Sequence, residues 1–250
     1  MKKRSLLKQA LALWLIFSGL IFAPSFAFSE TRFVINSENF PPFSNSARTG
    51  FEDLIAKELY GRLGISIRIN HLPAERALRV ANEGVEDGIL SRIGGMTKNY
   101  PNLIQLDEPT LVREFIAFSK KKDLKISGWE DLKPYNVGII TGWKIMEWNI
   151  KDVKSLTRVK DAKNLFKLLV NDRVDIIAFA RWPGLQQIKD LGLKTVRVIE
   201  NPLATKEMFF YVHKKHKKLI PQLNAALRAM KRDGTYQKIY ARTVSQLLTP

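Results

Sequence analysis

Two arginines follow apolar segments that the sequence predicts to be strands. Arg92 comes just after Gly88–Leu90, and Arg181 comes just after Val174–Phe179. A guanidinium group can form a bidentate pair with a carboxylate or a phosphate, and ligands of open α/β sheets lie beyond the carboxyl ends of the strands. Both arginines are therefore candidates for holding an anionic ligand. For each, the alternative is an ion pair within the protein.

Two further segments follow predicted strands and carry groups suited to a small ligand. The loop that holds Glu38 and Phe40 follows the first predicted strand, and the turn Thr141–Lys144 follows a later one. Free backbone amides at a strand-to-helix turn attract anions, although Gly142 can equally serve only to let the backbone bend. The strand-end rule nominates both segments as ligand contacts.

Aromatic side chains near these strand ends can line a ligand cleft, because ligand pockets favour aromatic rings. Trp143 and Trp182 fit that description, with core packing as the alternative. Arg76 begins a predicted helix, where a solvated or capping role competes with a ligand contact. The candidate ligand-binding residues are Glu38, Phe40, Arg76, Arg92, Thr141, Gly142, Trp143, Arg181 and Trp182.

The sequence offers little that is typical of an enzyme. It has no cysteine, which removes disulfides and thiolate metal sites, and it has three histidines. His71, His213 and His216 lack the spacing of metal ligands, and we find neither a nucleophile elbow nor a phosphate-binding loop. We therefore expect a protein that has no catalytic residues and needs no cofactor or metal.

Hydrophobic spacing predicts an α/β architecture in the first part of the chain. Strands are expected at residues 32–36, 65–70 and 87–90, and amphipathic helices at 51–63 and 74–82. The order strand, helix, strand, helix, strand predicts a sheet with crossover connections. A further apolar strand is expected at 115–119.

A second unit of the same kind follows. Strands are expected at 137–140, 158–159, 174–179, 195–199 and 208–212, and helices at 143–149, 162–170, 219–231 and 235–241. Asp161 is the expected N-cap of the helix at 162–170. No low-complexity linker separates the two units, which favours two lobes joined by a hinge of strands over two tethered domains.

The N-terminal segment indicates export. Four basic residues precede an apolar run that ends at Pro24, and Ser25–Ala27 provide small residues before a cleavage point. This order is typical of a secretory signal peptide over residues 1–27, cleaved near Ala27, with a retained membrane anchor as the alternative. We expect a soluble periplasmic protein, because export without cysteine suits that compartment.

The charge is strongly basic but diffuse. The formal net charge is +17, of which the expected signal peptide carries +4. The only dense basic run is His213–Lys218, for which a solvated loop is the plainest interpretation. Export argues against a nucleic-acid partner, whereas binding to an anionic membrane surface stays open.

The order of these segments resembles the extracytoplasmic solute-binding proteins of family 3, the polar amino-acid type of ABC transporters. The resemblance rests on the following segments of the mature chain: Asn39–Phe43, Gly50–Leu59, Glu83–Gly88, Trp129–Leu132, Val137–Gly142, Asp172–Ile177 and Arg232–Tyr240. It implies a periplasmic-binding-protein type II fold with two α/β lobes joined by a two-strand hinge. The first lobe would hold residues 28–118 and 209–250, the second would hold 119–208, and a ligand would be trapped by closure.

Two departures from the family pattern bear on the ligand. Amino-acid binders place an arginine just after a Gly-Met-Thr-like turn, but here Gly95–Thr97 is followed by Lys98 and Asn99, so Arg92 would have to replace it. The family also holds the ligand ammonium with an aspartate, where this chain has Ala180. The resemblance thus implies a divergent branch.

We expect a monomeric periplasmic solute-binding protein that captures a small polar, anionic solute by lobe closure. Its partner would be an ABC permease or a membrane sensor. The alternatives are a periplasmic enzyme on the same fold, such as a small-acid dehydratase, and a membrane-surface binding protein.

Overall fold

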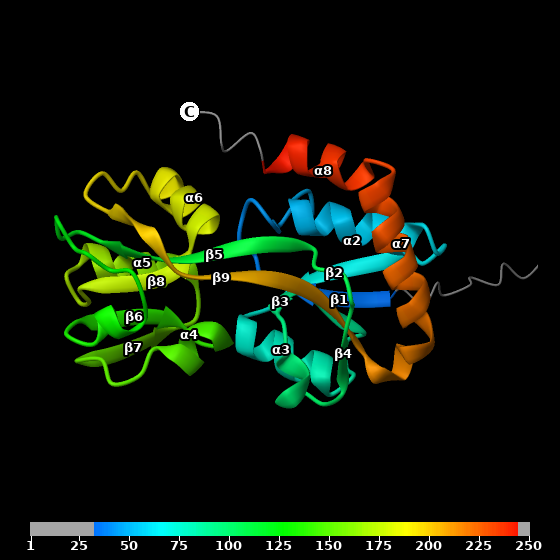
Figure 1. Ribbon diagram of the computed structural model, residues 1–250, viewed down its shortest axis with the longest axis horizontal. Coiled ribbons are helices and arrows are strands. Elements are labelled where there is room, and N and C mark those ends of the chain that lie inside the picture. The colour runs from blue at the N-terminus through cyan, green and yellow to red at the C-terminus, as the bar shows by residue number, and fades with distance from the viewer. Residues whose placement is uncertain (1–32, 245–250) are drawn as a thin grey trace, which may run out of the picture. The chain divides into compact units, whose positions relative to one another are not determined.

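The computed structural model describes residues 33–244, in which strands of a single mixed sheet run in the order β2-β1-β3-β9-β5-β8-β6-β7 (Figure 1). The predicted signal peptide therefore lies outside the described residues. The short strand β4 (Leu103–Gln105) pairs with β9 (Arg197–His213) beside this path. Among the described residues, no helix is both long and apolar enough to cross a bilayer.

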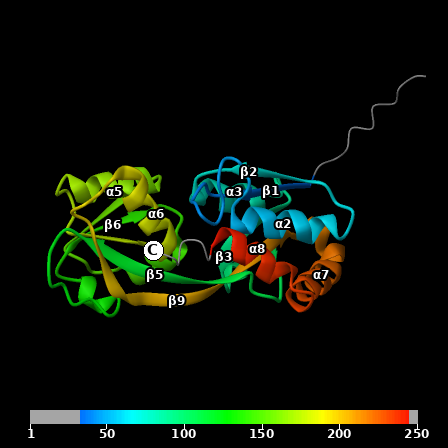
Figure 2. The same cartoon turned by 90° about the horizontal axis from the view of Figure 1, so that it is seen from above.

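The first lobe is built on three strands from the start of the described chain. β1 (Phe33–Ser37) pairs in parallel with β2 (Ile67–His71) and with β3 (Gly88–Ile93). Helix α2 (Phe51–Gly61) connects β1 to β2, and α3 (Ala74–Asn82) connects β2 to β3, as the sequence predicts. Two C-terminal helices, which pack with α2, complete this lobe (Figures 1 and 2): α7 (Ile220–Arg232) and α8 (Thr235–Thr243).

The second lobe repeats this topology. β6 (Asn136–Ile140) lies between β7 (Ser155–Val159) and β8 (Ile176–Ala180), and both pairings are parallel. The connecting helices are α4 (Lys144–Asn149) and α5 (Ala162–Val170), and α6 (Arg181–Leu191) follows β8. Asp161 caps α5 as predicted, because its carboxylate accepts a hydrogen bond from the Asn164 amide at 2.8 Å.

Two long antiparallel strands connect the lobes. β5 (Leu111–Ser119) pairs with β8 through residues 115–119 and with β9 along most of its length. β9 in turn pairs with β3 and β4 through residues 208–213. The predicted lobe boundaries after residues 118 and 208 both fall within these strands and stay predictions.

The sequence prediction is wrong about β9 and incomplete around it. The segments 195–199 and 208–212 belong to one strand, Arg197–His213, rather than to two. The polar stretch between them contains Pro202, which argues against a central strand, but Pro202 lies where the register of β9 against β5 shifts, between Ile199 and Ala204. β4 was not predicted, and β7 begins at Ser155 rather than at residue 158.

Helix α6 was also not predicted, because its first turn contains Pro183 and Gly184. Proline is tolerated in the first turn of a helix, where its missing N–H would have no partner within the helix. A Cβ atom at Gly184 would lie 2.1 Å from the Phe118 ring, so close packing against β5 requires a glycine there. The two residues that suggest a helix breaker are therefore compatible with the helix.

A charged network connects the start of β3 to the basic segment after β9. The Asp87 carboxylate accepts hydrogen bonds from the Val34 amide and from Lys215 Nζ at 2.7 Å, and its Oδ1 lies 2.7 Å from His216 Nε2. Burial disfavours the charged form, but these contacts outweigh it and hold the pKa of Asp87 below its ordinary value. Part of the basic run is thus used within the fold.

We expect Asp87→Asn to lower the free energy of unfolding by about 1 kcal/mol at neutral pH. Because the pKa is depressed in the folded state, the contribution of Asp87 is fully present above its unfolded pKa of about 4 and is lost as the pH falls through the folded value. Urea titrations from pH 2 to 7 would measure this. Asp172→Asn is the control, since its side chain is 78% exposed; equal effects in both variants would contradict the prediction.

Candidate functional site

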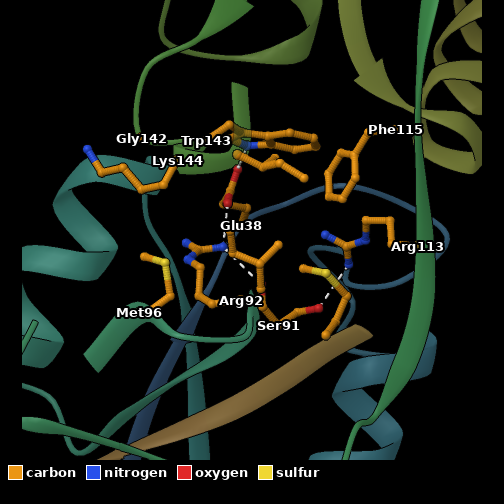
Figure 3. Close-up of a pocket in the computed structure, with 12 residues that line it drawn as sticks. Glu38, Ser91, Arg92, Met96, Arg113, Phe115, Gly142, Trp143 and Lys144 are labelled. Carbon is orange, nitrogen blue, oxygen red and sulfur yellow. Dashed lines mark hydrogen bonds and ion pairs between the residues drawn. The ribbon is translucent and has the colours of Figure 1, made fainter. Parts of the chain in front are cut away.

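A β-bulge directs Arg92 into the space between the lobes. The register of β3 against β9 shifts between Ile89 and Arg92, and Ser91 lies in the left-handed region with φ of 48°. A bulge bends its strand and re-aims the side chains beside it. Arg92 is only 7% exposed and lines a small cavity with Ser91 and Glu38 (Figure 3).

The guanidinium of Arg92 is only partly paired. Its Nη1 donates to Glu38 Oε1 at 2.7 Å and to the Ser91 carbonyl at 3.2 Å. Its Nε and Nη2 are buried and have no hydrogen-bond partner among the described residues. In an arginine the N–H groups of Nε and Nη2 point in the same direction, so this edge can hold the two oxygens of one carboxylate.

Trp143 approaches Glu38 from the second lobe. Its Nε1 donates to Glu38 Oε2 at 2.6 Å, so that both carboxylate oxygens of Glu38 are engaged. The indole stacks on Phe179, with ring centroids 4.6 Å apart, and meets Phe40 and Phe115 edge-on. Trp143 therefore packs in the core of the second lobe and also contacts the first lobe. Core packing does not prevent this side chain from lining the space between the lobes.

The turn before α4 makes the second contact between the lobes. Lys144 Nζ lies 2.6 Å from Glu75 Oε2 at the start of α3 and 2.7 Å from Glu147 Oε2. Burial disfavours the Lys144 ammonium, but these hydrogen bonds outweigh it and raise its pKa. The Gly142 amide donates to Glu147 Oε1 at 2.8 Å, so this predicted anion-binding amide already has a partner. Thr141 donates its amide to Val159 at 2.9 Å and does not line the two cavities described below.

Arg113 on β5 is a site residue that the sequence reasoning missed. It is 4% exposed, and its Nη2 donates to Glu52 Oε1 at 2.8 Å and to Ser91 Oγ at 2.9 Å. Its guanidinium lies over the Phe40 and Phe43 rings, 4.7 and 5.0 Å from their centroids. A signal was present in the sequence, because alternation along β5 places Arg113 on the same face as apolar Leu111 and Phe115.

Two cavities flank the Glu38–Trp143 contact. The smaller, of about 30 Å³, is lined by Arg92 and Arg113 together with the following residues: Glu38, Ser91, Ile93, Met96, Phe115, Gly142, Trp143, Lys144, Ile145 and Met208. The larger, of about 310 Å³, is lined by Glu38, Asn39, Phe40, His71, Leu72, Pro73, Ile140, Trp143, Lys160, Asp161, Ala162 and Phe179. Glu38 and Trp143 line both cavities.

Besides Thr141, three of the predicted ligand contacts do not line either cavity. Arg181 is engaged in ion pairs with Glu114 and with Glu200, the latter at 2.7 Å, which matches its structural alternative. Trp182 packs against the core of the second lobe, and Arg76 is exposed. Glu38, Phe40, Arg92, Gly142 and Trp143 do line one or both cavities. No cluster of metal-ligating side chains occurs among residues 33–244.

The family model of the bacterial extracellular solute-binding proteins, family 3, matches residues 33–246. The chain is 26% identical over 196 residues to an uncharacterized protein of Shewanella oneidensis, covering 74% of this chain and 73% of that one. It is 25% identical over 217 residues to the arginine-binding periplasmic protein of Mannheimia haemolytica, covering 83% and 88%.

Among solved structures, an ancestral arginine-binding protein bound to arginine is similar, with a TM-score of 0.74 and 23% identity. The match covers 85% of this chain and 98% of that one. The curled mixed sheet, the two lobes and the pair of connecting strands are those of the periplasmic-binding-protein type II fold. The chain belongs to the bacterial extracellular solute-binding proteins of family 3.

Proposed function

We propose that this protein captures a small solute through a carboxylate group that Arg92 holds between the two lobes. The observation that carries the proposal is the buried Nε–Nη2 edge of Arg92, which has no partner among the described residues. Buried polar groups are almost always hydrogen-bonded in native proteins. A carboxylate that accepts from both atoms would satisfy this edge with the bidentate geometry that arginine favours.

The charges around the smaller cavity support an anionic group rather than a cationic one. Both oxygens of Glu38 are already engaged by Arg92 and Trp143. The unpartnered polar atoms of Arg92 and Arg113 are all donors, and Ala180 offers no charge at the position where the family resemblance implies an aspartate for the ligand ammonium. One curated relative is named for binding arginine, a compound that has a carboxylate, which is consistent with this proposal.

Closure of the lobes would complete the site. Trp143 and Lys144 reach from the second lobe to Glu38 and Glu75 of the first, so approach of the lobes brings the indole and the ammonium to the edge of the cavity. Rotation about β5 and β9 would open it. A solute that contacts both lobes binds the closed form better and shifts the population toward it.

We further propose that the protein works in the periplasm after removal of residues 1–27, as a monomer that delivers its solute to an ABC permease. The curated relative described as a periplasmic binding protein supports import. Delivery to a membrane sensor is the second candidate, because it needs the same closed complex. Binding without turnover is the expected behaviour.

A thermal-shift screen of amino acids, mono- and dicarboxylic acids and neutral sugars tests the proposal. A carboxylate-bearing compound should raise the melting temperature in a concentration-dependent way, because binding to the native state stabilises it. Calorimetry should then give one site per chain, and the compound should be recovered unchanged. Stabilisation by neutral sugars alone, or chemical conversion of the compound, would contradict the proposal.

A further inference from the structure

We infer that Arg92 and Arg113 act together as a paired guanidinium site and that the solute carries two carboxylate groups. The inference rests on the proposed function, since it assigns one carboxylate to Arg92, and it goes further by giving a ligand role to Arg113. Both side chains come from the first lobe, Arg92 from β3 and Arg113 from β5, and both line the smaller cavity (Figure 3).

Ser91 holds the two guanidinium groups beside each other. Its carbonyl accepts from Arg92 Nη1 at 3.2 Å, and its hydroxyl is 2.9 Å from Arg113 Nη2. Because Ser91 is the left-handed residue of the β3 bulge, the same irregularity that directs Arg92 also brings the hydroxyl to Arg113. The bulge thus positions Ser91 so that it contacts both guanidinium groups.

Each guanidinium keeps buried donors without partners. These are Nε and Nη2 of Arg92 and Nε of Arg113. Two buried cations that line one small cavity repel each other, and unpaired buried donors carry a desolvation cost. A single carboxylate can satisfy the free edge of Arg92, but it leaves the donor of Arg113 unpaired. A solute with a second carboxylate relieves both costs.

The protein's own carboxylates compensate these cations only in part. Glu38 divides its oxygens between Arg92 and Trp143. Glu52 gives one oxygen to Arg113, while its other oxygen is buried without a partner. Burial raises the pKa of Glu52, although the charge of Arg113 opposes this shift. The raised pKa weakens the ability of Glu52 to neutralise Arg113. Glu38 and Glu52 thus leave the Nε–Nη2 edge of Arg92 and the Nε of Arg113 without acceptors, and a solute with two carboxylates can supply them.

Room for the chain between the carboxylates lies next to the cavity. The smaller cavity, of about 30 Å³, cannot hold a whole dicarboxylate, but the larger cavity of about 310 Å³ shares two lining residues with it, Glu38 and Trp143. Glu38 is the movable member of this pair, because Trp143 is stacked on Phe179. Displacement of the Glu38 carboxylate by the solute would open the connection.

Calorimetry with the whole mature protein tests the inference by pairing each straight-chain dicarboxylate from malonate to adipate with its monomethyl ester. For the best-fitting chain length, we expect the diacid to bind about tenfold to 100-fold more tightly than its half-ester, which is the range of charge-assisted hydrogen bonds. Arg113→Gln should reduce this difference to less than about threefold. The ester comparison uses the unmodified chain, so a misfolded variant cannot obscure it.

L-Glutamate and L-aspartate, measured beside glutarate and succinate, distinguish acidic amino acids from amine-free diacids, and tighter binding of either diacid class supports the inference. Equal affinities for diacid and half-ester, or tightest binding of an amino acid with one carboxylate, would overturn it while leaving the role of Arg92 intact. If no carboxylate of any kind binds, the proposed function itself fails.

Discussion

Replacement of Arg92 by glutamine is expected to weaken carboxylate binding by at least about 100-fold, since two charge-assisted hydrogen bonds are lost. Glutamine retains one donor but neither the positive charge nor the paired N–H groups of the free edge. The measurement is calorimetry with the best compound from the thermal-shift screen. Arg92 is on a strand that pairs with β1 and β9, so its backbone position does not depend on the side chain.

Arg181→Gln is the matched control, because Arg181 is an ion-paired arginine that lines neither cavity. It should alter the melting temperature without altering affinity. Glu38→Gln should act in the opposite direction to Arg92→Gln and raise carboxylate affinity by about threefold to tenfold. It removes a negative charge beside Arg92, and its single amide oxygen can accept from Trp143 while Arg92 Nη1 is freed for the solute. Unchanged affinity in Arg92→Gln, or loss of binding in Glu38→Gln, would contradict the assigned site.

Substitution of Gly142 by alanine should reduce affinity by about tenfold or more by keeping the lobes apart. Gly142 has φ of 87°, and a Cβ atom there would lie 2.3 Å from the backbone nitrogen of Glu75 on α3. Neither backbone can yield locally, so the turn before α4 and the start of α3 must separate. Small-angle scattering with saturating ligand should give a larger radius of gyration for the variant than for the parent protein.

A second glycine separates this steric effect from backbone strain. Gly192 has φ of 62°, and nothing lies within 4 Å of the Cβ it would carry. Alanine at either position costs about 1–2 kcal/mol for the left-handed backbone. Gly192→Ala should therefore lower the melting temperature and leave affinity unchanged. If the two variants lose affinity equally, closure does not depend on the approach of Gly142 to Glu75.

The sequence was sufficient to bring together residues on one side of the candidate site. Glu38 and Trp143 follow strands, and Arg92 lies near the carboxyl end of β3 rather than just past it as predicted. The carboxyl ends of parallel strands meet in space, so a rule about single segments brings the three residues together. The same rule selected Arg181, which also follows a buried strand. Its partners Glu114 and Glu200 come from β5 and β9, whose pairing depends on contacts far apart in the chain.

Arg113 is a residue that the strand-end rule failed to select. It lies within a strand rather than beyond its end, so the strand-end rule does not apply to it. Its partners are Glu52 on α2 and Ser91 on β3, and the left-handed conformation of Ser91 has no signature in a serine. Individual elements follow from periodicity, whereas a bulge and a cross-strand contact depend on the assembled sheet.

The path of β9 also bears on the order in which the chain acquires its structure. The strands β5, β6, β7 and β8 come from residues 111–180, so the second lobe can pair these strands before any later residue is present. The first lobe needs residues 208–213 to cover the open edge of β3, and it needs α7 and α8 to cover α2. A growing chain would thus present an unprotected strand edge until residues 208–243 had been added, which makes that interval the period of greatest exposure to aggregation.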